Sequence, residues 1–167
     1  MYILTRKMFF LIAALVAVTS GWISAAAAQE VGFKCGATIE SNVETSVDGR
    51  SFISTSFVQF TDIPFAITVG TIADCAVVLF TADTACKGAS TDDTCYIRAL
   101  DNGVPMRPGA GDVVLDSESQ TLSAHALAFV KRGPLQGTHH FTIEVRVGKT
   151  GTALVIDNWT VHVQLFS

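Results

Sequence analysis

The stretch "GTHHFTIEVRVG", residues 137–148, decides the fold that the sequence predicts. Every second position carries an apolar side chain: Phe141, Ile143, Val145 and Val147. The positions between them are polar: His140, Thr142, Glu144 and Arg146. Successive side chains of a β-strand point to opposite faces, so this alternation predicts a strand with one buried and one solvated face.

A second stretch repeats the pattern near the end of the chain. In "DNWTVHVQLF", residues 157–166, we expect four side chains to point inward: Trp159, Val161, Val163 and Leu165. Three are then expected to point outward: Thr160, His162 and Gln164. Before the first stretch, Pro134 and Gly137 in "RGPLQGT" predict the turn of a hairpin.

More short strands are predicted upstream, separated by Gly, Asp, Asn and Pro residues. Their segments are 38–47, 51–60, 65–70, 75–83, 95–103, 112–116 and 121–130. The first alternates Ile39, Val43 and Val47 with Glu40, Asn42 and Glu44. Asp48-Gly49 and Asn102-Gly103 are hairpin-turn signals. Segment 75–83 is apolar almost throughout, which predicts a central strand covered on both faces.

Roughly eight to ten short strands without a convincing helix predict an all-β fold, an antiparallel sandwich of two sheets. Their number and spacing favour a jelly roll. The alternative is an immunoglobulin-like sandwich, which would place a tryptophan between two core cysteines. Trp159 instead follows every cysteine.

The first 28 residues predict a signal peptide. Arg6 and Lys7 precede the apolar run "MFFLIAALVAV", and Ala26 and Ala28 form an A-x-A cleavage pattern. A retained membrane anchor is the alternative. The apolar run is short for this role, because a membrane-spanning helix needs about 20 apolar residues. Residues 29–167 would then be a single β-sandwich domain, secreted or, alternatively, periplasmic.

The charge excludes some partner classes. The chain carries a formal charge of −4. Without Arg6 and Lys7, nine basic residues remain against 15 acidic ones, which gives −6. A mildly acidic domain disfavours nucleic acid, and after loss of the leader it also disfavours anionic membrane.

The four cysteines predict two disulfides, because an exported chain with an even count commonly forms them. Three connectivities can be drawn, and we favour Cys86–Cys95 with Cys35–Cys75. The polar segment "CKGASTDDTC" would bring Cys86 and Cys95 together as the ends of a loop between two apolar strands. A zinc site would need short paired spacings such as C-x2-C, and none occurs.

Two regions resemble known proteins: "CYIRALDNGVPMRPG" and "FVKRGPLQGTHHFTIEVRV…DNWTVHV". They resemble small secreted bacterial β-sandwich proteins of unassigned function. "GTHHFTIEVRV" is also similar to the late strand of TNF/C1q-like jelly rolls, in which a Gly-Thr turn leads into an alternating strand. The resemblance covers roughly residues 75–163, implies the fold and carries over no catalytic residue. The collagen-like stalk of a full C1q protein is lacking.

The sequence shows no familiar hydrolase, zinc-protease, P-loop or Rossmann motif. "STDDTC" lacks the spacing of an EF-hand, so Asp92 and Asp93 are expected to be solvated loop residues. His139 and His140 would point to opposite faces, which argues against one site containing both together with Lys131 and Arg132. His140 and His162 would meet only if their strands paired, and no further ligand completes a metal site. We therefore expect no cofactor and no metal.

A catalytic acid pair would have to come from six residues: Asp83, Asp101, Asp112, Asp116, Glu118 and Glu144. Most of them lie in turns, where such residues commonly serve the backbone. Arg98 lies within a strand, which predicts a salt bridge with Asp83 or Glu144.

The sequence favours a secreted binding or interaction domain without catalytic activity. Its partner would be a protein or a carbohydrate, and the candidate partner-facing residues are Tyr96, Arg98, His140 and Arg146. Two alternatives remain open. One is a self-assembling subunit of an exported homo-oligomer, because apolar residues make up 49% of the chain. The other is a secreted hydrolase.

Overall fold

The computed structural model describes residues 35–67, 73–88, 92–108, 113–117 and 120–167. The predicted signal peptide lies outside them. In the described residues, no helix is long and apolar enough to cross a membrane. The strands are β1 (Thr38–Ser46), β2 (Arg50–Phe52), β3 (Val58–Ile67), β4 (Ala73–Lys87), β5 (Thr94–Asp101), β6 (Val104–Pro105), β7 (Val113–Ser117), β8 (Ser123–Leu135), β9 (Gly137–Val147) and β10 (Ala153–Phe166).

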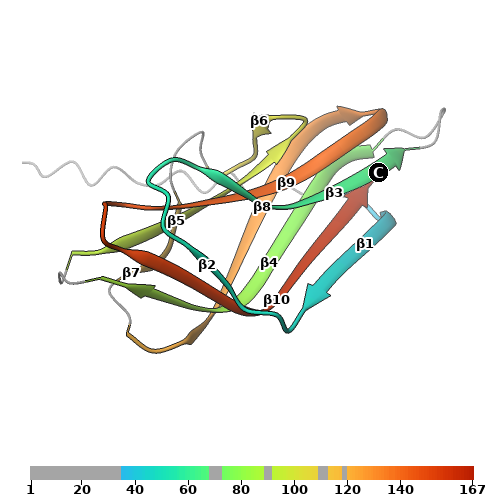
Figure 1. The fold of residues 1–167 in the computed structure, drawn as a ribbon. Helices are drawn as coiled ribbons and strands as arrows, with labels where there is room; N and C mark the ends of the chain where they lie inside the picture. The colour runs from blue at the N-terminus through green and yellow to red at the C-terminus, as the bar shows by residue number, and fades with distance from the viewer. Residues whose placement is uncertain (1–34, 68–72, 89–91, 109–112, 118–119) are drawn as a thin grey trace, which may run out of the picture. The chain divides into compact units, whose positions relative to one another are not determined.

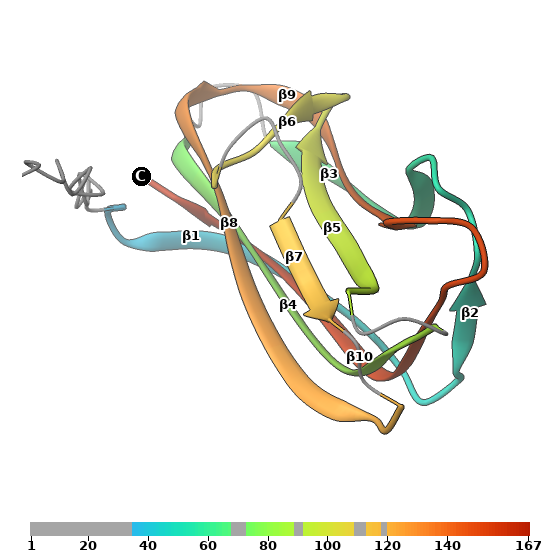
Figure 2. The ribbon, with the colours of Figure 1, turned by 90° about the vertical axis from the view of Figure 1, so that its left-hand side faces the viewer.

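The strands form two antiparallel sheets that pack face to face (Figures 1 and 2). Sheet A has the order β1-β10-β4-β8, with β2 also beside β10. Sheet B has the order β3-β9-β5-β6, with β7 also beside β5. The predicted all-β, two-sheet sandwich is therefore confirmed.

The pairings are nested, as they are in a hairpin folded over on itself. β1 pairs with β10, β3 with β9, β4 with β8, and β5 with β7. The outermost and third pairs lie in sheet A, and the second and fourth lie in sheet B. This alternation between sheets is the arrangement of a jelly roll, the predicted type of sandwich.

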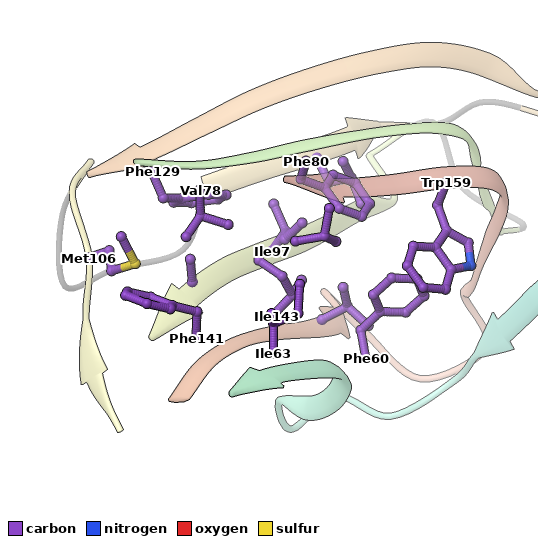
Figure 3. Close-up of a cluster of buried hydrophobic side chains, with 14 of the residues drawn as sticks. Phe60, Ile63, Val78, Phe80, Ile97, Met106, Phe129, Phe141, Ile143 and Trp159 are labelled. Carbon is purple, nitrogen blue, oxygen red and sulfur yellow. The ribbon is translucent and has the colours of Figure 1, made fainter. Parts of the chain in front are cut away.

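The core lies between the sheets. Figure 3 shows Phe60 and Trp159 at one end of the buried cluster and Met106 and Phe141 at the other. The Phe60 ring lies 4.9 Å from that of Trp159, centre to centre, in an edge-on arrangement. Aromatic pairs favour this geometry over a face-to-face stack.

Both amphipathic stretches have the predicted phase. The inward residues of β9 and β10 are buried, from Phe141 to Val147 and from Trp159 to Leu165. β4 differs from expectation on one face. It is central and its inner face is buried, but Val77 and Leu79 are only half-buried and Thr81 is exposed, because nothing packs on the outer face of sheet A in the described residues.

The first strand also differs from expectation. β1 forms, but Val43 and Ile39 are exposed by 54% and 39%. Val43 pairs with outward-facing His162, whereas Glu44 pairs with inward-facing Val161. The polar phase of β1 thus faces sheet B, where Glu44 Oε2 accepts a hydrogen bond from Thr61 Oγ1 at 2.5 Å.

Two predicted hairpins are wrong. Asp48-Gly49 does not reverse the chain, since β1 and β2 both pair with β10, at different positions along it. Likewise β8 and β9 belong to different sheets, so "RGPLQGT" connects the layers. The third signal is confirmed: Asn102 and Gly103 have φ of 48° and 78° and join β5 to β6 in a tight hairpin.

Both predicted disulfides are present. Cys35 pairs with Cys75, and Cys86 pairs with Cys95, with Cα atoms 5.9 and 5.8 Å apart. In the described residues no cysteine is free. Two disulfides indicate an oxidising, extracytoplasmic environment.

Candidate binding face

The four candidate partner-facing residues lie on the outer face of sheet B. Tyr96 and Arg98 belong to β5, while His140 and Arg146 belong to β9. The register places Tyr96 opposite Arg146. Because paired residues of neighbouring strands share a face, three of the four predicted residues come together and His140 lies further along the strand.

Arg98 forms the predicted salt bridge. Its Nη2 lies 2.5 Å from Glu144 Oε2, and its Nε donates to the same oxygen at 2.6 Å. Of the two predicted partners, Glu144 is therefore the one used. Asp83 instead accepts a hydrogen bond from Asn158 Nδ2 at 3.0 Å.

Two aromatic rings complete this cluster. The guanidinium carbon of Arg146 lies 4.0 Å from the centre of the Tyr96 ring. Phe57, from the segment between β2 and β3, lies under Arg98 at 4.0 Å and under Arg146 at 5.4 Å. We call Phe57, Tyr96, Arg98, Glu144 and Arg146 the arginine–aromatic cluster. No sequence signal indicated Phe57, because its position depends on how a loop folds over a distant strand.

His140 has separate partners. Its Nδ1 lies 3.1 Å from Asp62 Oδ2, and Thr142 Oγ1 donates to Asp62 Oδ1 at 3.4 Å. His162 lies on the outer face of sheet A, so the two histidines cannot share a metal ion. Within the described part of the chain, no group of three or more His, Cys, Asp or Glu residues could hold a metal ion.

An inward polar cluster was not predicted. His139 Nδ1 lies 2.6 Å from Asp101 Oδ1, and both residues are buried. Lys131 Nζ approaches Asp101 Oδ2 from sheet A at 3.9 Å. His139 and His140 face opposite sides of β9, as expected, but the sequence did not predict that His139 and Lys131 meet at Asp101. Asp101 alternates in step with the inward-facing residues Ile97 and Ala99. This alternation is the sequence signal that could have placed the Asp101 side chain inward.

Ser123, His125 and Asp116 lie close together but lack the geometry of a catalytic triad. Ser123 Oγ lies 2.9 Å from His125 Nε2, and Asp116 Oδ2 lies 3.7 Å from the same nitrogen. In a triad, the serine and the aspartate contact opposite nitrogens of the ring. This histidine therefore cannot pass a proton from the serine while the aspartate orients it.

Four of the six candidate catalytic acids are described, and each is engaged by a different partner. Asp83 contacts Asn158, Asp101 contacts His139, Asp116 accepts from Thr84 Oγ1 at 2.9 Å, and Glu144 contacts Arg98. Asp112 and Glu118 lie outside the described residues.

The aspartates of "STDDTC" are not simply solvated. Asp93 is buried, and its Oδ1 lies 2.9 Å from Lys149 Nζ. Asp92 Oδ1 lies 2.7 Å from the same nitrogen. Hydrogen bonds to Asp92 and then to Asp93 raise the pKa of Lys149 above its usual value. Lys149 thus contacts both aspartates, whereas the sequence predicts that they are solvated loop residues.

Comparison with known proteins adds little. No protein-family model and no curated protein matches the sequence. Among solved structures, the chain is similar to one described as dimeric latent PorU from Porphyromonas gingivalis, with 12% identity and a TM-score of 0.38. The match covers 81% of this chain and 14% of that chain.

Proposed function

We propose that this protein is a secreted binding domain without catalytic activity, and that the outer face of sheet B binds another protein. The observation that carries the proposal is the arginine–aromatic cluster. Arginine and tyrosine are enriched among the residues that dominate protein–protein binding energy. Here the two arginines are held in place by Glu144 and by the faces of two rings.

The preorganised side chains support a binding role. A long side chain that is already ordered loses less rotamer entropy when a partner arrives, by about 0.5–1.5 kcal/mol for each one. Val114 adds an apolar contact beside the cluster, since it pairs with Tyr96 and is 51% exposed. His140 and Asp62 extend the same face as a polar margin.

A protein partner is favoured over a carbohydrate. Sugar-binding faces usually offer an open aromatic ring, and Tyr96 is the one aromatic residue among the four candidate partner-facing residues. Arg146 covers this ring at 4.0 Å, and Tyr96 is partly buried. Stacking of a sugar on the covered side would first have to displace the guanidinium.

Site-specific crosslinking tests this function. A photoreactive phenylalanine replaces Thr142 on the proposed face or, as a control, His162 on the outer face of sheet A. The chain without residues 1–28 is then irradiated with extracytoplasmic proteins of its source. We expect one discrete protein adduct from position 142 that weakens at least about tenfold in Tyr96→Ala and Arg146→Ala. Equal adducts from both positions, or none, would contradict the proposal.

A second candidate function, self-assembly, rests on the edge of sheet A. β8 has 13 residues, and among the described residues it pairs only with β4, apart from a bridge between Arg107 and Val130. The part Ser123–Ala128 has no Lys, Asp, Glu or Pro, which are residues that usually block edge-to-edge pairing. A second copy could therefore add its own strand here.

A further inference from the structure

A basic pocket lies where the segment after β6 meets the edge of β8. Its volume is about 230 Å³, and five residues line it: Pro105, Arg107, Val130, Lys131 and Arg132. Three of these side chains are cationic, although the whole chain has a formal charge of −4. The pocket thus concentrates charge of the opposite sign to that of the protein.

Backbone hydrogen bonds form the wall of this pocket. Arg107 N donates to Val130 O at 2.9 Å, and Val130 N donates to Arg107 O at 2.7 Å. This bridge fixes the Arg107 backbone against the edge of β8. The next two residues of β8, Lys131 and Arg132, then supply the remaining charges. The backbone positions of Arg107 and of the two β8 cations thus follow from strand pairing.

Lys131 retains hydrogen-bonding capacity. Its Nζ lies 3.9 Å from Asp101 Oδ2, which is beyond hydrogen-bonding distance. The same carboxylate has a much closer contact with His139, at 2.6 Å. Asp101 therefore attracts the ammonium group without occupying its three N–H donors.

Arg107 also lacks an acidic partner. Its side chain is exposed and forms no ion pair with any acidic residue that the structure describes. A guanidinium offers a planar fork of donors that matches two oxygens of one oxyanion. Arg107 and Lys131 together can thus supply a bidentate contact and a point charge.

We propose that this pocket binds a single oxyanion group, a phosphate, sulfate or carboxylate, carried by a larger ligand. The volume is below the roughly 300–1,000 Å³ of pockets that enclose a whole small molecule, so the pocket suits one group. The site is separate from the arginine–aromatic cluster, and its existence does not depend on the function proposed for that face.

Titration of the ¹⁵N-labelled chain without residues 1–28 tests the site by NMR, with inorganic phosphate, sulfate and acetate at low ionic strength. We expect saturable shifts of the Arg107, Val130 and Lys131 amides with at least one anion. The ranking of the three anions identifies the chemistry of the ligand group. Arg107→Gln keeps the backbone bridge, and we expect it to weaken binding at least about tenfold, as should Lys131→Gln.

Lys87→Gln is the matched control, since it removes one exposed positive charge elsewhere. Lys87 lies 11 residues along β4 from Ala76, the partner of Lys131, or about 35 Å away. The anion affinity of Lys87→Gln should equal that of the wild type. Tyr96→Ala should also leave the anion affinity unchanged. Absence of saturable shifts with all three anions would overturn the proposal, as would equal weakening by Lys87→Gln and Arg107→Gln.

Discussion

Lys149 joins the turn before β10 to the loop before β5 through two carboxylates, Asp92 and Asp93. These hydrogen bonds raise its pKa above the unfolded value of about 10.4. The folded state therefore binds this proton more tightly than the unfolded state does. The resulting stabilisation is complete below about pH 10.4 and is lost as the pH rises through the raised pKa.

Lys149→Gln should consequently lower stability at neutral pH and have a shrinking effect at alkaline pH. Urea denaturation of both chains at about pH 8 and at several values above about pH 10.4 measures the difference. The lysine side chain is 41% exposed, so we expect a small difference in stability that shrinks steadily as the pH rises. A difference that stays constant across this range would contradict the assignment.

The Phe60 ring on β3 packs against three other aromatic rings. Its ring meets those of Phe52 and Phe80 at 5.9 Å and that of Trp159 at 4.9 Å. Phe60→Ala should cost about 3–5 kcal/mol of unfolding free energy, because it leaves a cavity between the three remaining rings. Ile53→Ala, at a 75% exposed position, should cost less than about 0.5 kcal/mol. Urea denaturation compares the two, and equal costs would contradict this packing.

Alternation explains which residues could be placed from the sequence. It fixed the inward phase of Trp159 and the outward phase of Arg98, because each depends only on neighbours in its own strand. It could not place Phe57 against Arg98 or Lys131 beside Asp101. Those contacts depend on loop folding and on the register between two sheets, which a local pattern does not encode.

Among the elements, β1 depends most on the disulfide near its start. Eight of its nine residues are exposed, so few side-chain contacts hold it, and Cys35–Cys75 links the chain before it to β4. Its apolar residues indicated a strand but not its orientation, which β10 sets through the Val43–His162 pair. Exposed Ile39 and Val43 therefore add little burial to offset the entropy of ordering β1.

Removing Cys35–Cys75 should destabilise the protein more than removing Cys86–Cys95. The linked residues are 40 apart in the first case and nine apart in the second. Loop-closure entropy gives about 4 kcal/mol for the longer loop and about 3 kcal/mol for the shorter one. Urea denaturation of the two Cys-to-Ser pairs measures this order. Hydrogen exchange should also show that the β1 amides exchange first in the Cys35→Ser/Cys75→Ser variant. If the β1 amides stay protected in this variant, the disulfide is not what holds β1 in the sheet.

For the whole molecule, the sequence predicted two sheets but not which strands share one. Turn signals suggested that successive strands pair, as in the Asp48-Gly49 and Pro134-Gly137 segments. The structure instead sends most connections from one sheet to the other and pairs strands that are distant in sequence. A jelly roll consists of such long-range pairs, and its topology is therefore weakly encoded in local turn chemistry.

One consequence of this topology is the edge that β8 gives to sheet A. Val130 N bonds outward to Arg107 O, and successive amides of a strand point in alternate directions. The backbone groups of Ala124, Ala126 and Ala128 therefore also point away from β4. All three residues are exposed, and a twofold axis near Ala126 would let two copies pair antiparallel.

Ala126→Pro tests this edge with little disturbance to the sheet. It removes an N–H that points away from β4, so the β4–β8 ladder keeps its hydrogen bonds. Sedimentation velocity of the chain without residues 1–28 should show concentration-dependent dimers for the wild type and monomers for Ala126→Pro. Ala126→Lys should also give monomers, whereas Val43→Lys, on the outer face of β1, should still dimerise. If the wild-type chain stays monomeric at every concentration, self-assembly is rejected as a function. The proposal that the outer face of sheet B binds another protein would then be the one that stands.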